Sequence, residues 1–253
     1  MIEFEDVVFG YGEEKKELDH VSFQIKNGEQ VGLIGANGAG KSTLMKAMLG
    51  LVHAEGKIRV KELEVCHKNL GKIRQILGYV LQDSDNQMFM PTVYEDMIFG
   101  PLNYGKNREE ADEMVQNVLE RLNLVHLKNR QNYKMSGGEK RMAAIATILV
   151  MQPEVMLLDE PSTALDPKNR RRLINTLKEL TTTKIIASHD LDMVLETCDR
   201  VLIMSEGKIV ADGPAKEILR DRELLEQYDL ELPFCLAGVP ENSCSDCNER
   251  SGQ

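Results

Sequence analysis

The segment from Gly35 to Thr43 combines glycines, a lysine and hydroxyl side chains in an order that suits phosphate binding. It fits the pattern G-x-x-x-x-G-K-[ST], and its members are Gly35, Ala36, Asn37, Gly38, Ala39, Gly40, Lys41, Ser42 and Thr43. Glycines let backbone N–H groups turn inward around phosphate oxygens, and a helix that begins at the loop adds a favourable dipole. We therefore expect Lys41 to reach the β- and γ-phosphates of a nucleotide and Ser42 to hold Mg²⁺.

A chance glycine-rich turn is the alternative interpretation of this loop. The neighbouring sequence disfavours it, because a short apolar run at 30–34 leads into the loop and a helical pattern at 43–49 follows. Gly50 is the expected C-cap of that helix. Strand, glycine loop and helix, in that order, form the context that a phosphate-binding loop requires.

Two adjacent carboxylates, Asp159 and Glu160, end another apolar run at 155–158. One carboxylate on Mg²⁺ and a second near the γ-phosphate is the arrangement for metal-assisted attack by water. Asp159 is the predicted Mg²⁺ ligand of the pair. A solvated acidic turn is the alternative, and it would be the better interpretation if the glycine loop were absent.

The elements that position these residues predict an α/β fold with a P-loop core and a mostly parallel sheet. The apolar run 30–34 leads directly into the glycine loop, and the short runs 155–158 and 184–187 each deliver polar residues at their C-terminal ends. Such runs suit parallel strands covered on both faces. Ligands of open α/β sheets collect at these strand ends.

The rest of the chain predicts two subdomains and a tail. Residues 2–9 and 21–25 alternate as half-buried strands of an N-terminal antiparallel β-subdomain, with a hairpin turn expected at 27–29. Residues 83–150 read as a mostly helical insertion, in which apolar residues recur at helical spacing over 108–122. A late hairpin is expected at 201–210. We assign 1–232 to one domain and 233–253 to a loosely ordered tail.

Composition limits the remaining possibilities. The net charge of −10 argues against direct nucleic-acid binding, which usually involves a basic surface. The longest apolar run, 143–151, is far shorter than the ~20 residues that span a bilayer. The N-terminus lacks the pattern of a secretory signal, so a cytosolic chain is expected. Five cysteines in such a chain indicate reduced thiols.

Motifs farther along the chain make it resemble the ATP-binding-cassette (ABC) ATPases over roughly residues 1–230. Ser136, Gly137 and Gly138, followed by Glu139, resemble the signature motif of that family. The segment 162–166, which ends at Asp166, resembles the loop that links two cassettes. The resemblance implies that Ser136 and Gly138 bind the ATP held by the opposite subunit.

Three isolated residues complete the resemblance. Gln82 and His189 end strands as the glutamine and the switch histidine of the family do, and Tyr11 lies where an aromatic ring stacks on adenine. The resemblance implies that Gln82 contacts Mg²⁺ or the attacking water. It also implies that His189 contacts the γ-phosphate. Glu160 would polarise the attacking water. Simple packing is the alternative for Tyr11.

Within the family, the chain is similar to ATPases of energy-coupling-factor importers, including cobalt and nickel importers. The similarity lies in 82–89, which contains a second glutamine, Gln87, and in 136–146. The methionines of this region, Met88, Met90 and Met97, either form a pliable docking surface or pack the helical subdomain. The tail contains Cys235 and also Cys244 and Cys247, which have C-x-x-C spacing. We favour a disordered tail over a metal site there.

The leading hypothesis is therefore the ATP-hydrolysing subunit of an importer for a metal ion or a vitamin, with ATP and Mg²⁺ as its ligands. The expected partners are a second ABC ATPase subunit, either a copy or a paralogue, and integral-membrane transporter subunits. The expected location is peripheral, at the cytoplasmic face of the cell membrane. The ATPase of another transporter, such as an exporter, and a soluble cassette protein of DNA repair or translation are the alternatives.

Overall fold

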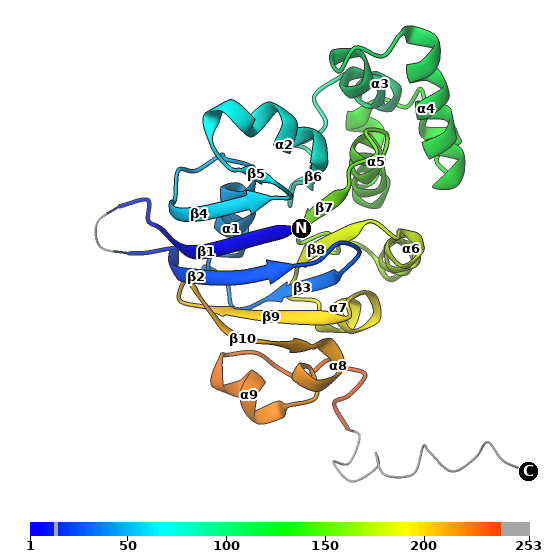
Figure 1. Cartoon of the computed structure of the whole chain (residues 1–253). Coiled ribbons are helices and arrows are strands. Elements are labelled where there is room, and N and C mark those ends of the chain that lie inside the picture. Colours follow the sequence, from blue (N-terminus) through cyan, green and yellow to red (C-terminus); the bar gives the residue numbers. More distant parts are fainter. Residues whose placement is uncertain (13–14, 239–253) are drawn as a thin grey trace, which may run out of the picture.

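The computed structural model describes residues 1–12 and 15–238, which form two sheets with surrounding helices (Figure 1). The larger sheet has the strand order β10-β9-β3-β8-β7-β6. Its strands are β3 (Gln30–Ile34), β6 (Leu77–Val80), β7 (Val155–Asp159), β8 (Thr183–Ala187), β9 (Arg200–Ser205) and β10 (Lys208–Pro214). All neighbours pair in parallel except β9 and β10, which form the predicted late hairpin. The predicted α/β core is confirmed.

The smaller sheet is antiparallel and confirms the predicted N-terminal β-subdomain. Its order is β2-β1-β4-β5, with β1 (Ile2–Phe9), β2 (Leu18–Ile25), β4 (Glu55–Val60) and β5 (Leu63–Glu64). The hairpin predicted at 27–29 is wrong, because β2 and β3 belong to different sheets. The backbone N–H of Gly28 donates to the Thr183 hydroxyl at 2.8 Å, which ties this turn to the larger sheet.

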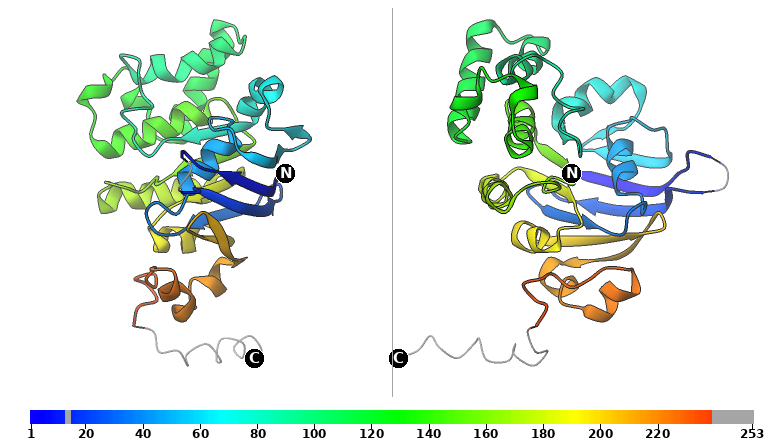
Figure 2. Two further views of the ribbon diagram at one scale, coloured as in Figure 1. Left: turned by 90° about the vertical axis from the view of Figure 1, so that its left-hand side faces the viewer. Right: turned by 180° about the vertical axis from the view of Figure 1, so that it is seen from behind.

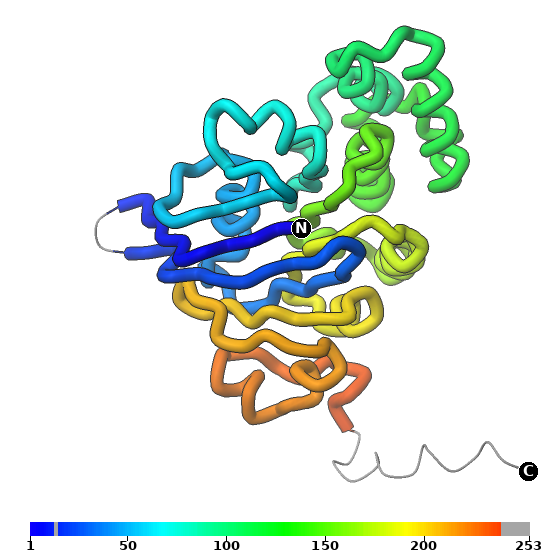
Figure 3. The backbone as a smooth tube through the Cα atoms, in the orientation of Figure 1, coloured from blue at the N-terminus to red at the C-terminus, as the bar shows by residue number. Residues whose placement is uncertain are grey.

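A helical region is inserted between β6 and β7, as the path of the chain in Figure 3 shows. It contains α3 (Val93–Asn103), α4 (Arg108–Arg121) and α5 (Gly137–Leu149). The other helices are α1 (Lys41–Met48), α2 (Leu70–Ile76), α6 (Pro167–Glu179), α7 (Leu191–Thr197), α8 (Ala215–Ile218) and α9 (Arg222–Gln227). Short 3₁₀ turns lie at His67–Asn69, Val125–Leu127 and Asn132–Lys134. The domain boundaries at 83–150 and 232 stay predictions.

The core lies on both faces of the larger sheet. Successive side chains of a strand point to opposite faces, so Leu157 packs toward α1 and the smaller sheet while Leu158 packs toward the helices α5 to α7. The same alternation separates Leu33 from Ile34. Between their first and last residues, β3 and β7 are therefore apolar, and the polar residues lie at the strand termini. Figure 2 shows the sheet between these two layers.

Local sequence signals explain where the functional helices begin. Ser136 and Glu139 form a capping box at the start of α5, and Asn107 and Glu110 form another at α4. Asp166 caps α6, with Pro167 at its first position. The C-cap of α1 is Leu49, so the predicted cap Gly50 lies one residue farther on, in the left-handed conformation (φ 62°) that often follows a helix end.

The methionines of the helical region divide between the two alternatives stated above. Met88 and Met97 are buried in the core, so they pack the helical region. The docking-surface interpretation of Met88 is therefore wrong. A turn closed by the Met88 N–H and the Ser84 carbonyl directs this side chain inward, whereas Phe89 remains 66% exposed.

Within the described residues, no helix combines the length and apolar composition that a bilayer crossing requires. The predicted tail lies largely outside those residues, which end at 238. Cys244 and Cys247 are among the residues not described, and Cys235 is exposed.

Lys184 is a buried cation at the junction of β8 and α6. Its Nζ donates to the carbonyls of Leu177 and Leu180 and thereby pairs acceptors at the end of α6. Burial lowers its pKa from 10.5 to about 8. Because the unfolded chain holds the proton more tightly, the protonated lysine costs stability below pH 8, and this cost disappears as the pH rises from about 8 to 10.5.

We predict that the free energy of unfolding of the protein, minus that of a Lys184→Met variant, rises by about 3 kcal/mol across this pH range. Denaturant titrations at a series of pH values measure this difference. The neighbouring thiol of Cys198, whose pKa burial raises to about 12, titrates in both proteins and largely cancels. A pH-independent difference would contradict the assignment.

Candidate functional site

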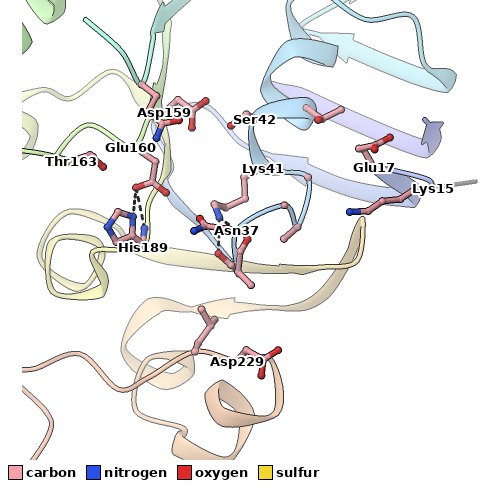
Figure 4. Close-up of a pocket in the computed structure, with 18 of the residues that line it drawn as sticks. Lys15, Glu17, Asn37, Lys41, Ser42, Asp159, Glu160, Thr163, His189 and Asp229 are labelled. Atoms are coloured by element: carbon pink, nitrogen blue, oxygen red, sulfur yellow. Dashed lines mark hydrogen bonds and ion pairs between the residues drawn. The ribbon is translucent and has the colours of Figure 1, made fainter. Parts of the chain in front are cut away.

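A cavity of about 710 Å³ lies at the carboxyl ends of the parallel strands (Figure 4). It brings together the whole loop from Gly35 to Thr43 and five other predicted residues: Tyr11, Gln82, Asp159, Glu160 and His189. The four remaining predicted residues, Ser136, Gly137, Gly138 and Asp166, are not among those that line it. Sequence reasoning missed the other lining residues, which are Lys15, Glu17, Thr163, Asp229 and Leu230.

The phosphate-binding loop depends on backbone conformations that favour glycine. Gly40 has a φ of 108°, and a Cβ there would lie 2.3 Å from the Glu17 carbonyl oxygen. Gly38 has a φ of 79° with open space where a Cβ would be, so its backbone faces free volume. Helix α1 begins at Lys41 without a side-chain cap. Its first N–H groups are thus oriented for an anion, as a phosphate site requires.

Lys41 is buried and folded back onto its own loop. Its Nζ donates to the carbonyl oxygens of Gly35 at 2.6 Å and Ala36 at 3.1 Å. Burial lowers the pKa of Lys41, while the carboxylates of Glu160 and Asp159 oppose that shift. These carbonyls hold the ammonium group in the cavity, where it can exchange them for phosphate oxygens.

Asp159 has one engaged and one unpaired carboxylate oxygen. Its Oδ2 accepts a hydrogen bond of 3.0 Å from the Tyr79 hydroxyl. Its Oδ1 is buried and has no hydrogen-bond partner among the described residues. A buried unpaired carboxylate oxygen is costly unless a ligand pairs it, and Mg²⁺ prefers oxygen ligands. With Ser42 lining the same cavity, the residues fit the predicted Mg²⁺ site.

Glu160 and His189 contact each other directly, although the sequence placed them separately near the γ-phosphate. The Glu160 Oε2 lies 2.7 Å from His189 Nδ1 and accepts the backbone N–H of His189 at 3.3 Å (Figure 4). Glu160 is buried and has a φ of 46°, a left-handed conformation that is uncommon for glutamate. The turn therefore holds this carboxylate in one place beside Asp159.

Gln82 is exposed just beyond β6, and a buried arginine holds its backbone. Arg141 of α5 donates to the carbonyls of Leu81, Gln82 and Glu160. Burial lowers the pKa of Arg141. One guanidinium therefore joins the helix that follows the signature motif to the glutamine segment and to Glu160. In the sequence, Arg141 could have been recognised as a functional residue only because it is a charged residue next to the apolar run 142–146.

Gln87 has a structural position in this loop. Its side chain accepts the Leu81 N–H and donates to the Ala144 carbonyl and the Thr147 hydroxyl. Gln87 thus links the segment around Gln82 to α5 through hydrogen bonds.

The signature residues lie at the start of α5. Ser136 and Gly137 are exposed, and Gly138 packs so closely on Asn169 that a Cβ would lie 2.3 Å from its Nδ2. The Glu139 carboxylate accepts the Ser136 N–H at 2.8 Å, and this contact lowers the pKa of Glu139. Glu139 therefore forms part of the capping box at the start of α5.

Tyr11 lines the cavity and is 63% exposed. Its backbone N–H donates to the Glu17 carboxylate at 3.0 Å, and Phe9 contacts its ring edge to face. Fixed in this way, the ring offers an open surface on which an adenine could stack. Neither Glu17 nor Lys15 belongs to a sequence motif that could have identified it.

Comparison with known proteins agrees with this geometry. The family model described as ABC transporter matches residues 18–163. A provisionally named ABC transporter ATP-binding protein of Geobacter sulfurreducens is 44% identical over 241 residues, 95% of this chain and 97% of that protein. The energy-coupling factor transporter ATP-binding protein EcfA of Methanothermobacter thermautotrophicus is 40% identical over 239 residues, 92% of this chain and 77% of that protein.

Solved structures share the fold. The structure of cbiO1 from Clostridium perfringens, described as part of the ABC transporter complex cbiONQ, is similar with a TM-score of 0.80 and 35% identity, over 93% of this chain and 97% of that one. The ATP-binding cassette MJ0796, solved as a dimer bound to ADP and Pi, is similar with a TM-score of 0.76 and 26% identity, over 85% of this chain and 99% of that one.

Proposed function

This chain belongs to the ABC transporter ATPase family, and from that premise we propose that it powers an importer of the energy-coupling-factor type. The proposed cargo is a metal ion such as cobalt or nickel, or a vitamin, and the chain would act at the cytoplasmic face of the membrane. Its similarity to EcfA and to cbiO1 over most of the chain supports this subclass. The observation that carries the catalytic part is the buried pair Asp159 and Glu160 beside the phosphate loop.

The proposed mechanism assigns one task to each side chain of the cavity. Lys41 exchanges its loop carbonyls for the β- and γ-phosphate oxygens. Ser42 and Asp159 hold Mg²⁺, which neutralises charge on the phosphate oxygens when it is bound. Glu160 orients and polarises the attacking water, and Gln82 reaches the Mg²⁺ or that water from the end of β6. His189, whose Nδ1 lies beside Glu160, would contact the γ-phosphate.

We further propose that two cassettes, identical or paralogous, complete each site. Ser136 and Gly137 are exposed and do not line the cavity of their own chain. A second chain could therefore present them, with Gly138 and Asp166, to the nucleotide held by the first. The dimeric MJ0796 cassette supports such an arrangement.

The membrane partner is proposed to dock on the apolar surface formed by Phe89, Met90, Phe99 and Leu102, here called the α3 surface, which lies over the buried Ile98. Phe89 and Phe99 are exposed and meet edge to face at 5.2 Å. A cavity of about 510 Å³ lies along α3 beside them. The buried Asp96 carboxylate accepts the N–H groups of Phe89 and Met90 and so holds the edge of this surface.

This docking proposal is tested with Phe89→Glu and Met90→Glu variants. A membrane helix would bury these side chains at about 1.5–3 kcal/mol each, so the charged variants should lose most membrane recovery and transport. Co-purification with the membrane subunits, and uptake of labelled Co²⁺, Ni²⁺ and vitamins, measure both effects. ATP binding should persist, because neither residue lines the nucleotide cavity.

Met88→Glu is the matched comparison. It places a charge in the core, so it should lower the melting temperature, whereas the two surface variants should melt like the unmodified protein. Unchanged co-purification and uptake in the surface variants would show that the membrane subunits bind elsewhere.

A further inference from the structure

Tyr79 lies on the same face of the larger sheet as the predicted Mg²⁺ ligand. Strands β6 and β7 are parallel, with Tyr79 opposite Leu157. Because side chains alternate, Leu157 and Asp159 share a face, and Tyr79 shares it too. That face packs toward α1, which begins at the phosphate loop and carries Ser42.

The contact between Tyr79 and Asp159 is specific. The phenol hydroxyl lies 3.0 Å from Oδ2, and 80 residues separate the two along the chain. The ring is half-buried and packs against the apolar cluster around α1, which restricts its position. With Oδ2 held in this way, Oδ1 is the oxygen left without a partner among the described residues.

We propose that Tyr79 is a positioning residue that orients Asp159 toward the divalent cation. This inference rests on the Mg²⁺ site of the proposed function. A hydrogen bond to one oxygen of a ligating carboxylate fixes the rotation of that carboxylate. The carboxylate is then already oriented before the cation binds. Loss of such an outer contact typically weakens metal binding by about 10–100-fold.

The test uses Tyr79→Phe, which removes one hydroxyl and keeps the ring. Tyr94→Phe is the matched control, because the Tyr94 hydroxyl also hydrogen-bonds an aspartate, Asp112, in the helical region. Asp159→Asn serves as the positive control. Mn²⁺ is titrated into protein held in excess over a non-hydrolysable ATP analogue, and free Mn²⁺ is followed by electron paramagnetic resonance.

We expect about tenfold weaker Mn²⁺ binding in Tyr79→Phe and unchanged binding in Tyr94→Phe. Affinity for the analogue in EDTA and the melting temperature should change little in both, which separates positioning from a general loss of structure. Mn²⁺ binding within twofold of the unmodified protein in Tyr79→Phe, with weakened binding in Asp159→Asn, overturns this inference alone. Unchanged binding in Asp159→Asn as well overturns the proposed Mg²⁺ site and this inference with it.

Discussion

Replacement of Glu160 by glutamine should abolish steady ATP hydrolysis while ATP still binds. Glutamine keeps the shape of the side chain and an oxygen that can accept the His189 N–H, but it loses the negative charge that polarises water. General-base catalysis typically contributes about 10²–10⁴-fold, so turnover should fall by at least about a hundredfold. Phosphate release and equilibrium binding of labelled ATP measure the two quantities.

The same variant should accumulate as an ATP-bound dimer, because hydrolysis no longer separates the chains. Light scattering with and without ATP measures this accumulation. Glu154→Gln is the matched control, since the same chemical change is made at an exposed residue that pairs with Lys61 on the surface. Turnover in Glu160→Gln equal to that of the control would refute the catalytic assignment.

Two inactive chains should restore activity when they are combined, provided that each ATP site is shared. Lys41→Ala disables the phosphate loop of its own chain, and Ser136→Arg disables the site that the chain completes on its partner. A heterodimer of these chains keeps one site with both parts intact. If the sites act independently, it should hydrolyse ATP at about half the normal rate, because a closed two-fold dimer has two equivalent sites. Purification through two different tags isolates the heterodimer.

The matched comparison places both substitutions in one chain and pairs it with an unmodified chain. Shared sites then leave no complete site, whereas sites within single chains would leave one. Activity in this second heterodimer but not in the first would therefore refute the shared arrangement. Nucleotide binding to both heterodimers identifies the case in which one complete site binds ATP but cannot turn over alone.

The sequence by itself determined the features that depend on near neighbours. The glycine loop was predictable because G-x-x-x-x-G-K-[ST] needs only local backbone freedom, and Gly38 and Gly40 indeed have positive φ. The runs 30–34 and 155–158 were recognisable as buried strands because both of their faces are covered. The ABC family, the fold and the ATPase class are confirmed by the comparisons. The roles of the individual site residues stay predictions.

Only the tertiary structure decided which distant residues meet. Strand order and register bring His189 onto Glu160 across 29 positions and Tyr79 onto Asp159 across 80. A reverse turn buries Met88 and leaves Phe89 exposed. The sequence cannot predict which of two adjacent apolar residues is buried. Arg141 reaches three backbone carbonyls because α5 packs over the strand ends. Such contacts arise from the pairing of strands and the packing of helices, and no local pattern specifies them.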